Sequence, residues 1–325
     1  MLICQFLNCT IFGDDYNILN FMNEIENIID EFRKLNLSTY PEKKIKDLFN
    51  RTGNIGAIIV TLHKGKTVMR ARPNNGYERF KKKSDFSFKP QDFNKTFQRA
   101  STPNKTMFYA SLIPEKIEKG ELDNMRIIGV SETIPMMRNK KESGFQKISF
   151  GRWTVEEDIN LIAIVHEQSY YKESNYTREL VDAYNNFSAH QSKELVEKSL
   201  KFQNFLASEF SKEIITADYD YMISAIFTEN VTKNGLDGVL YPSVRVDGQG
   251  FNIAITPEAT NRLGLYVAGE CSIYKLNDQV VIGNDAIIEL DGSQTEFELI
   301  DSENDQADCL AILGVKSIDD LIKDR

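Results

Sequence analysis

Apolar residues recur at helical spacing near the N-terminus of the chain. Between residues 16 and 35 they are Ile18, Leu19, Met22, Ile25, Ile28, Ile29 and Phe32. This is the i, i+3, i+4 pattern of an amphipathic helix. Acidic residues come early in the stretch and Arg33 and Lys34 close it, which complements the helix dipole. The same period predicts helices over 43–50, 155–167, 177–186, 192–211, 219–230 and 317–323.

Shorter apolar runs predict strands over 56–63, 67–72, 107–111, 126–130, 147–150, 238–244, 250–256, 265–274 and 286–290. The polar segment 77–105 has no period and predicts a long loop, and the acidic segment 301–308 predicts a linker. Residues 1–12 are apolar without a basic start, so we expect a buried strand or loop there and no signal peptide. Strands, then helices, then strands again indicate an α+β fold.

Composition narrows the class of protein. The 325 residues are 41% hydrophobic and 27% charged, as in ordinary globular proteins. A net charge of −9 argues against a general nucleic-acid binder. The sequence lacks an uncharged apolar run of about 18 residues, which a membrane span needs, and its four cysteines lack zinc-site spacing. We therefore expect a cytoplasmic protein with no metal, membrane or nucleic-acid partner.

Charge is unevenly distributed along the chain. Residues 64–105 carry twelve Lys or Arg against three Asp or Glu, whereas residues 278–308 are strongly acidic. The basic segment is either a solvated surface or a place where an anionic ligand binds. The acidic segment either keeps the protein soluble or lies against the basic one. Both questions stay open at the level of sequence.

Four short motifs place polar groups at the ends of predicted strands, whereas GxSxG, GxGxxG, P-loop and HExxH motifs do not occur in the sequence. The four are VMRARP at 68–73, FQRAS at 97–101, MFYAS at 107–111 and DGVLYPS at 237–243. Glu132 follows the strand predicted at 126–130, and Asn252 lies in the strand after the fourth motif. Strand alternation puts Arg70 and Arg72 on one face, where two guanidiniums can hold a phosphate.

This order of motifs resembles the RES family, which is named for its arginine, glutamate and serine. The resemblance spans residues 67–258 and implies an ADP-ribosyltransferase-like mixed sheet core. It divides the chain into a helical N-terminal extension (1–55), a catalytic domain (56–260) and a β-rich C-terminal extension (261–325). Members consume NAD, often as the toxin of a toxin–antitoxin pair. The resemblance therefore implies NAD as substrate and an antitoxin protein as partner.

The resemblance also assigns roles to single residues. Arg70 and Arg99 match the two arginines, Tyr109 the tyrosine, Glu132 the acid and Ser243 the serine. The arginines, together with Asn252, would bind NAD, and the other three residues would carry the chemistry.

Two of these assignments have competitors. Arg72 competes with Arg70 for the first role. Glu118 and Glu121 lie nearer to the usual distance from the tyrosine than Glu132 does, but Glu132 directly follows an apolar strand.

The chemistry suits these residue types. Loss of nicotinamide leaves a cationic ribose. Glu132 would stabilise this charge or hydrogen-bond the ribose hydroxyls, Tyr109 would stack on the nicotinamide ring, and Ser243 would orient the ribose or the amide. Arginine forks would hold the diphosphate. Two alternatives stay open. One is a non-catalytic module of the same fold that binds a nucleotide or a partner. The other is a glycosidase-like hydrolase with Glu132 and Asp237 as its carboxylate pair.

Overall fold

The computed structural model describes residues 3–7, 21–74, 79–112, 134–138, 141–164, 175–242, 251–303 and 306–322. Their fold is α+β, as the order of predicted elements indicates. The chain forms two units, each assembled from distant segments. Unit 1 comprises Met1–His63, Lys89–Tyr109 and Asp158–Asn261, and unit 2 comprises Lys64–Phe88, Ala110–Glu157 and Arg262–Arg325. The N-terminal helices pack inside unit 1 together with later segments of the chain.

Unit 1 is built on a mixed sheet with the strand order β1-β2-β6-β7-β8. Its strands are β1 (Ile3–Leu7), β2 (Ala57–Leu62), β6 (Ile159–Ala163), β7 (Gly238–Pro242) and β8 (Phe251–Ile255). Neighbours are antiparallel except for the parallel pair β6–β7. The parallel pair is possible because helices connect the two strands along the chain.

The prediction of a helix over 155–167 is wrong, because the structure has strand β6 (Ile159–Ala163) there. Ile159, Leu161, Ile162 and Ala163 are all buried, so both faces of this strand are covered. A short apolar run looks the same in a strand buried on both faces as in a buried helix, and periodicity does not separate the two.

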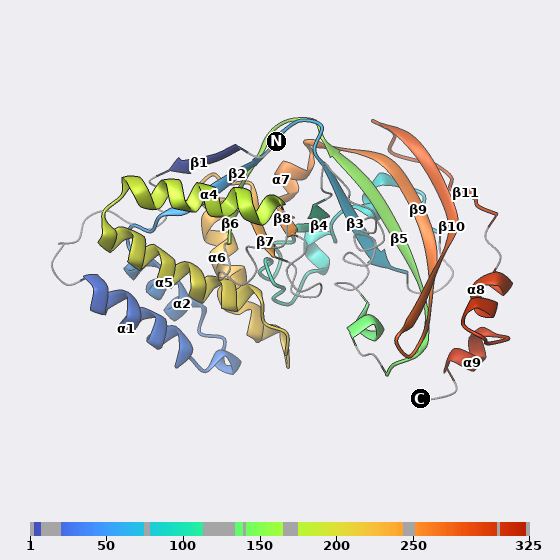
Figure 1. Ribbon diagram of the computed structural model, residues 1–325, viewed down its shortest axis with the longest axis horizontal. Helices are drawn as coiled ribbons and strands as arrows, with labels where there is room; N and C mark the ends of the chain where they lie inside the picture. The colour runs from blue at the N-terminus through green and yellow to red at the C-terminus, as the bar shows by residue number, and fades with distance from the viewer. Residues whose placement is uncertain are drawn as a thin grey trace. The chain divides into compact units, whose positions relative to one another are not determined.

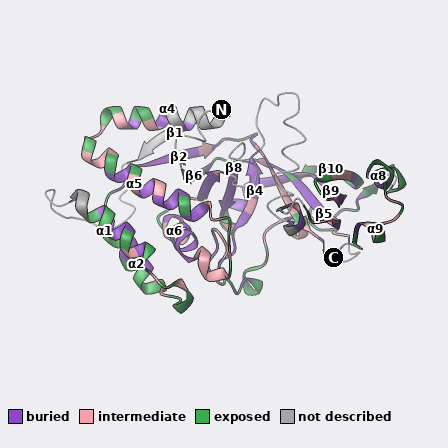
Figure 2. Ribbon diagram, turned by 60° about the horizontal axis from the view of Figure 1, so that its bottom comes forward, coloured by how far each residue is buried: buried purple, intermediate pink, exposed green. Residues whose placement is uncertain are grey.

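Helices cover the sheet of unit 1. They are α1 (Phe21–Arg33), α2 (Glu42–Arg51), α4 (Asn175–His190), α5 (Lys193–Phe210), α6 (Met222–Lys233) and the single turn α7 (Pro257–Thr260), as Figure 1 shows. Buried side chains of α1, α2, α5 and α6 form one core cluster with residues of β2, β6, β7 and β8. Helices α1, α2 and α5 are buried on one side and exposed on the other, whereas α6 is buried on all sides over residues 222–228 (Figure 2). The helical periods of the sequence predict α1, α2, α4, α5 and α6, whereas the single turn α7 is not among the expected helices.

Helix α5 is tied to the residue before β2. The Ser199 hydroxyl accepts a hydrogen bond from the Gly56 N–H at 2.8 Å, and the Gln203 amide donates to the Gly56 carbonyl at 2.7 Å. A Cβ at Gly56 would lie 2.1 Å from Cζ of Phe187 in α4. The absence of a side chain at Gly56 therefore leaves room for the Phe187 ring of α4 at this point of the backbone.

Unit 2 is built on antiparallel strands in the order β4-β3-β5-β9-β10-β11. They are β3 (Thr67–Pro73), β4 (Phe108–Leu112, whose first two residues count in unit 1), β5 (Gly144–Val155), β9 (Leu263–Leu276), β10 (Gln279–Gly292) and β11 (Ile300–Asp301). Two helices follow, α8 (Gln306–Ile312) and α9 (Ile318–Ile322). Helix α8 starts inside the expected linker 301–308, because Cys309 and Leu310 pack with Tyr274 in a small core.

The acidic C-terminal segment lies against part of the basic segment within unit 2. We call residues 292–301 the acidic strap. Its Thr295 carbonyl accepts a backbone hydrogen bond from Lys83 at 2.9 Å. Three ion pairs join the same two segments: Arg79–Asp301 (2.7 Å), Lys81–Glu298 (3.2 Å) and Lys82–Glu296 (3.3 Å). Of the two interpretations of the acidic segment, direct contact is therefore confirmed for residues 79–83.

Among the described residues, no helix combines the length and the hydropathy that crossing a membrane requires.

Candidate functional site

The structure describes five of the seven residues expected to form the site. Arg70 and Arg72 belong to unit 2, and the other three belong to unit 1: Arg99, Tyr109 and Asn252. The remaining expected acids and the serine lie outside the described residues: Glu132, Ser243, and the competing Glu118 and Glu121.

Tyr109 joins the second motif to the third. Its hydroxyl accepts a hydrogen bond from the Ala100 N–H at 3.0 Å and shares another with the Ser101 hydroxyl at 2.8 Å. The Ser101 hydroxyl in turn accepts from the Met107 N–H at 3.0 Å. The loop 100–107 is therefore closed on itself, and both ends of the Tyr109 side chain are held in place.

Three of the four motifs share one core cluster in unit 1. Ala100, Met107 and Tyr241 are buried in it, and Tyr109 packs against it. Tyr241 lies directly opposite Asn252 in the β7–β8 register. Because Ala254, two residues after Asn252, also belongs to the cluster, Asn252 faces the same side of the sheet.

Arg99 binds the end of a helix. Its Nη1 donates to the carbonyl of Phe210, the last residue of α5, and its Nη2 donates to the Lys212 carbonyl at 3.1 Å. The guanidinium carbon also lies 5.4 Å from the ring centroid of Tyr221. A cation at these carbonyls complements the helix dipole. Arg99 therefore stabilises the C-terminal end of α5.

Arg70 and Arg72 hold one segment of unit 2. Nε of Arg70 donates to the Ser87 carbonyl at 3.0 Å, and Nη1 of Arg72 donates to the Asp85 carbonyl at 3.1 Å. The Arg72 guanidinium also lies 4.7 Å from the ring centroid of Phe80. Both arginines reach the same segment, as the alternation of strand β3 predicts for side chains on one face.

A buried carboxylate in unit 2 belongs to none of the sequence motifs. Glu270 of β9 is 3% exposed. Its Oε1 accepts from the Asn74 amide at 2.6 Å, and its Oε2 lies 3.5 Å from Nε of Arg79 and 3.8 Å from Nζ of Lys147. Hydrogen bonds and two cations satisfy this carboxylate in the interior.

Glu270 lies on the same face of the sheet as Arg72. Ser149 of β5 stands opposite Arg72 of β3 on one side and opposite Glu270 of β9 on the other. The signal in the sequence is a single acid inside the otherwise apolar strand LYVAGECSIY. A lone charge in a buried strand requires partners from elsewhere in the chain, and sequence spacing does not reveal them.

The Asp-Gly pair of the fourth motif is explained by strand packing. The Asp237 carboxylate accepts from the Asn160 N–H at 2.7 Å, which joins the start of β7 to β6. A Cβ at Gly238 would lie 2.0 Å from the backbone oxygen of Ala254 in β8, so only glycine fits there. The Asp237 carboxylate thus binds the backbone of β6. In the glycosidase alternative it would instead act on substrate as one of a pair of carboxylates.

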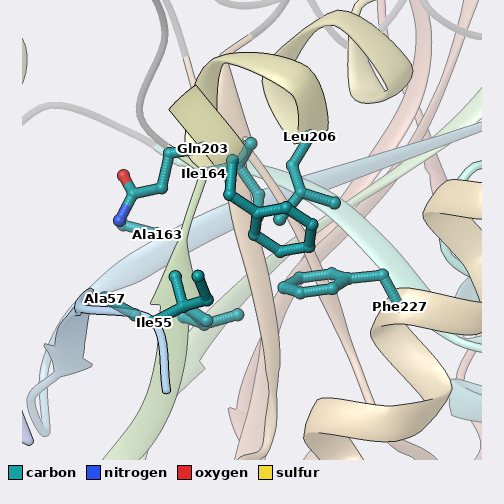
Figure 3. A pocket seen from close by; sticks show the side chains of 9 residues that line it. Ile55, Ala57, Ala163, Ile164, Gln203, Leu206 and Phe227 are labelled. Carbon is teal, nitrogen blue, oxygen red and sulfur yellow. The ribbon is translucent and has the colours of Figure 1, made fainter. Parts of the chain in front are cut away.

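A small cavity lies between helices α5 and α6 and the sheet. Ile55, Gln203, Leu206 and Phe227 are among the side chains around it (Figure 3). Its volume is about 10 Å³, which is the space of a single water molecule. It therefore offers no room for an organic ligand. Within the described residues, no three His, Cys, Asp or Glu side chains are grouped as metal ligands.

No protein-family model, curated protein or solved structure matches the chain. A functional assignment therefore rests on the residues of this chain and their contacts.

Proposed function

We propose that the protein is an enzyme that cleaves the nicotinamide–ribose bond of NAD. The observation that carries the proposal is the ordered set of motifs, three of which meet in one core cluster of unit 1. The Tyr109 hydroxyl joins two of them directly. Segments separated by more than a hundred residues thus contribute to one region, as the parts of an active site do.

The proposed reaction breaks the bond between C1′ of the ribose and N1 of nicotinamide. The bonding electron pair leaves with nicotinamide, and C1′ becomes cationic. The Glu132 carboxylate stabilises this charge. The Tyr109 ring stacks on the nicotinamide, and Ser243 and Asn252 orient the ribose by hydrogen bonds. Water, inorganic phosphate or an acceptor group then bonds to C1′ and gives up a proton.

The arginines of β3 are proposed to bind the diphosphate of NAD. A guanidinium presents a planar fork of donors that matches phosphate oxygens. Contacts with Asp85 and Ser87 fix the directions of Arg72 and Arg70, so their positions are set before a ligand arrives. We further propose an ADP-ribosyltransferase-like core, a cytoplasmic location, a toxin function and an antitoxin partner that blocks the site.

One observation favours a non-catalytic binding module as the second candidate. Arg99, which the resemblance assigns to NAD binding, donates to the carbonyls at the end of α5, so one of the expected residues of the enzyme site serves the fold. A module of this kind would bind NAD or another nucleotide without consuming it.

Expression in a bacterial host tests the proposal. The parent protein is expected to lower cellular NAD and slow growth, and Glu132→Gln is expected to abolish both effects at a matched soluble level. Glu289→Gln is the control, because Glu289 is an exposed acid on β10. Equal toxicity of the parent and Glu132→Gln would contradict the role of Glu132 and direct attention to Glu118 or Glu121.

A further inference from the structure

Unit 1 contains a second cavity, with a volume of about 300 Å³. That volume is at the lower end of the range for small-molecule sites. The loop before β4, the C-terminal turn of α6 and the start of α7 form its walls, and its charged lining residues are Lys105, Glu229, Lys233 and Glu258. None of the residues assigned to NAD lines this cavity. Two lining residues, Ala100 and Met107, belong to the second and third motifs, so the cavity borders the region proposed for NAD without using its ligand-binding residues.

Two lysines converge on one partly buried carboxylate oxygen. Oε1 of Glu229 lies 2.6 Å from Nζ of Lys105 and 2.8 Å from Nζ of Lys233. The Glu229 side chain is 13% exposed, whereas both lysines are more than half exposed. Burial alone would raise the pKa of Glu229, but the hydrogen bonds and charges of the two lysines lower it to about 2. The carboxylate therefore stays ionised and holds two ammonium groups close together.

This charge pattern selects for an anion. Glu229 and Glu258 are the two acids in the described lining, and Glu229 is the more buried of them. Two ammonium groups already bind the Glu229 carboxylate, so they would repel a cation that approached it. An anion would meet the second ammonium charge, which Glu229 does not neutralise. Glu258 also lines the cavity and is exposed, as both lysines are, so water and salt screen all three charges alike, and an anion would be held by direct contact with the two ammonium groups rather than by a net charge of the lining.

The rest of the cavity wall suits a small ligand that carries hydroxyl groups. Thr102 and Thr106 are buried there, and Oγ1 of Thr106 has no hydrogen-bond partner among the described residues. This wall is fixed without a ligand by two hydrogen bonds of Asn94. Its side-chain amide donates to the Thr102 backbone carbonyl at 2.8 Å, and its backbone carbonyl accepts from the Asn104 N–H at 2.7 Å. A buried hydroxyl without a partner costs free energy, and rotation of the Thr106 side chain towards a ligand in the cavity would remove that cost.

We infer that this cavity binds a small organic anion. Lys105 and Lys233 hold its carboxylate or phosphate group, and Thr102 and Thr106 face its hydroxylated body.

Calorimetry on the full-length protein without NAD tests this inference. Three probes share one three-carbon body: glycerol 3-phosphate, glycerate and glycerol. At least one of the two anions is expected to bind, and glycerol is not. Binding of glycerol 3-phosphate alone identifies a phosphate site, and binding of glycerate alone identifies a carboxylate site. Absence of binding by both anions at millimolar concentrations, or equal binding of glycerol, would overturn the inference.

Variants then locate the site. Lys105→Met and Lys233→Met are each expected to weaken anion binding by about tenfold or more, because each removes a charge-assisted hydrogen bond. Lys46→Met is the matched control, since Lys46 is also a partly exposed lysine paired with a glutamate, Glu42 at 3.7 Å, but lies on α2. Circular dichroism checks that each variant folds. Parent-like affinity in both cavity variants would show that the anion binds elsewhere.

Thr106→Val provides a second readout. The change keeps the shape and removes the unpartnered hydroxyl, so the variant is expected to unfold no earlier than the parent and to bind the anion a few-fold more weakly. A purely structural hydroxyl would give the opposite result, lower stability with unchanged affinity, and that result would overturn the role of Thr106.

Discussion

The hydroxyl of Tyr109 accepts a hydrogen bond from the backbone N–H of Ala100 at 3.0 Å. This contact closes the loop that separates the second motif from the third. Ala100 is buried, so its N–H has no access to water when the hydroxyl is removed. We expect Tyr109→Phe to lower the free energy of unfolding by about 1–3 kcal/mol, measured by urea denaturation.

Tyr40→Phe is the control for this change. The Tyr40 hydroxyl donates to the Asp218 carboxylate at 2.7 Å, but Tyr40 is 47% exposed and water can replace its partner. Its effect is expected to be below about 1 kcal/mol. Equal destabilisation by the two variants would mean that the closed loop contributes no more than a surface contact.

Arg70 is expected to bind the diphosphate through its planar fork. Arg70→Lys keeps the charge and loses the fork, so it should weaken NAD binding by about 1–3 kcal/mol, measured by titration of NAD into a Glu132→Gln background. Arg152→Lys is the control, because Arg152 is an exposed arginine of β5 that stands opposite Met69 and so lies on the other face of the sheet. An effect of Arg72→Lys with none from Arg70→Lys would assign the first role to Arg72.

Glu229 predicts a pH-dependent stability. The two lysines lower its pKa to about 2 in the folded state, against 4.5 for an unperturbed glutamate. Because the pKa is lower in the folded state, the ionised Glu229 carboxylate stabilises the fold. This contribution is complete above about pH 4.5 and is lost as the pH falls towards 2. We expect Glu229→Gln to be less stable than the parent by about 1–2 kcal/mol at pH 7, after allowance for solvent at the lysine ends.

Urea unfolding between pH 3 and pH 7 measures this difference, which should shrink as the solution becomes more acidic. Glu42→Gln is the control, because the Glu42–Lys46 pair is exposed on α2. A difference between Glu229→Gln and the parent that does not change with pH would contradict the assignment of this stability to the ionised carboxylate.

Arg79 bridges the acidic strap and the buried Glu270. Its guanidinium pairs with Asp301 at 2.7 Å and lies 3.5 Å from the Glu270 carboxylate. Arg79→Gln removes a cation from beside a buried acid, so we expect it to lower the free energy of unfolding of unit 2 by about 1–3 kcal/mol. Lys81→Gln breaks an exposed pair with Glu298 and should cost less than about 1 kcal/mol. Similar losses in thermal unfolding of the two variants would show that Glu270 does not depend on Arg79.

Local patterns of the sequence predict the helices closely. The helices expected over 43–50 and 192–211 are α2 (Glu42–Arg51) and α5 (Lys193–Phe210), the latter with Ser192 as its N-cap. Their apolar stripes directly reflect one buried face. Strand β6 was missed because it is buried on both faces. Strand β10 is longer than expected because pairing with β9, rather than its own polarity, sets its length.

In the candidate site, too, contacts between residues near in sequence can be predicted, whereas contacts between distant residues cannot. The contact of Tyr109 with Ala100 spans nine residues, so neighbouring motifs suggest it. Arg99 reaches the end of α5 across 111 residues, and Glu270 meets Asn74 across 196. Contacts of this length depend on the packing of whole elements. Motif spacing therefore proposes which residues matter, and the fold decides what each of them contacts.

Release of nicotinamide from NAD by the purified full-length protein tests the central claim most directly. Chromatography after incubation with NAD is expected to show free nicotinamide for the parent and none for Glu132→Gln, with the same circular dichroism spectrum for both. Absence of nicotinamide with the parent, or its release by Glu132→Gln at the parental rate, would contradict the account.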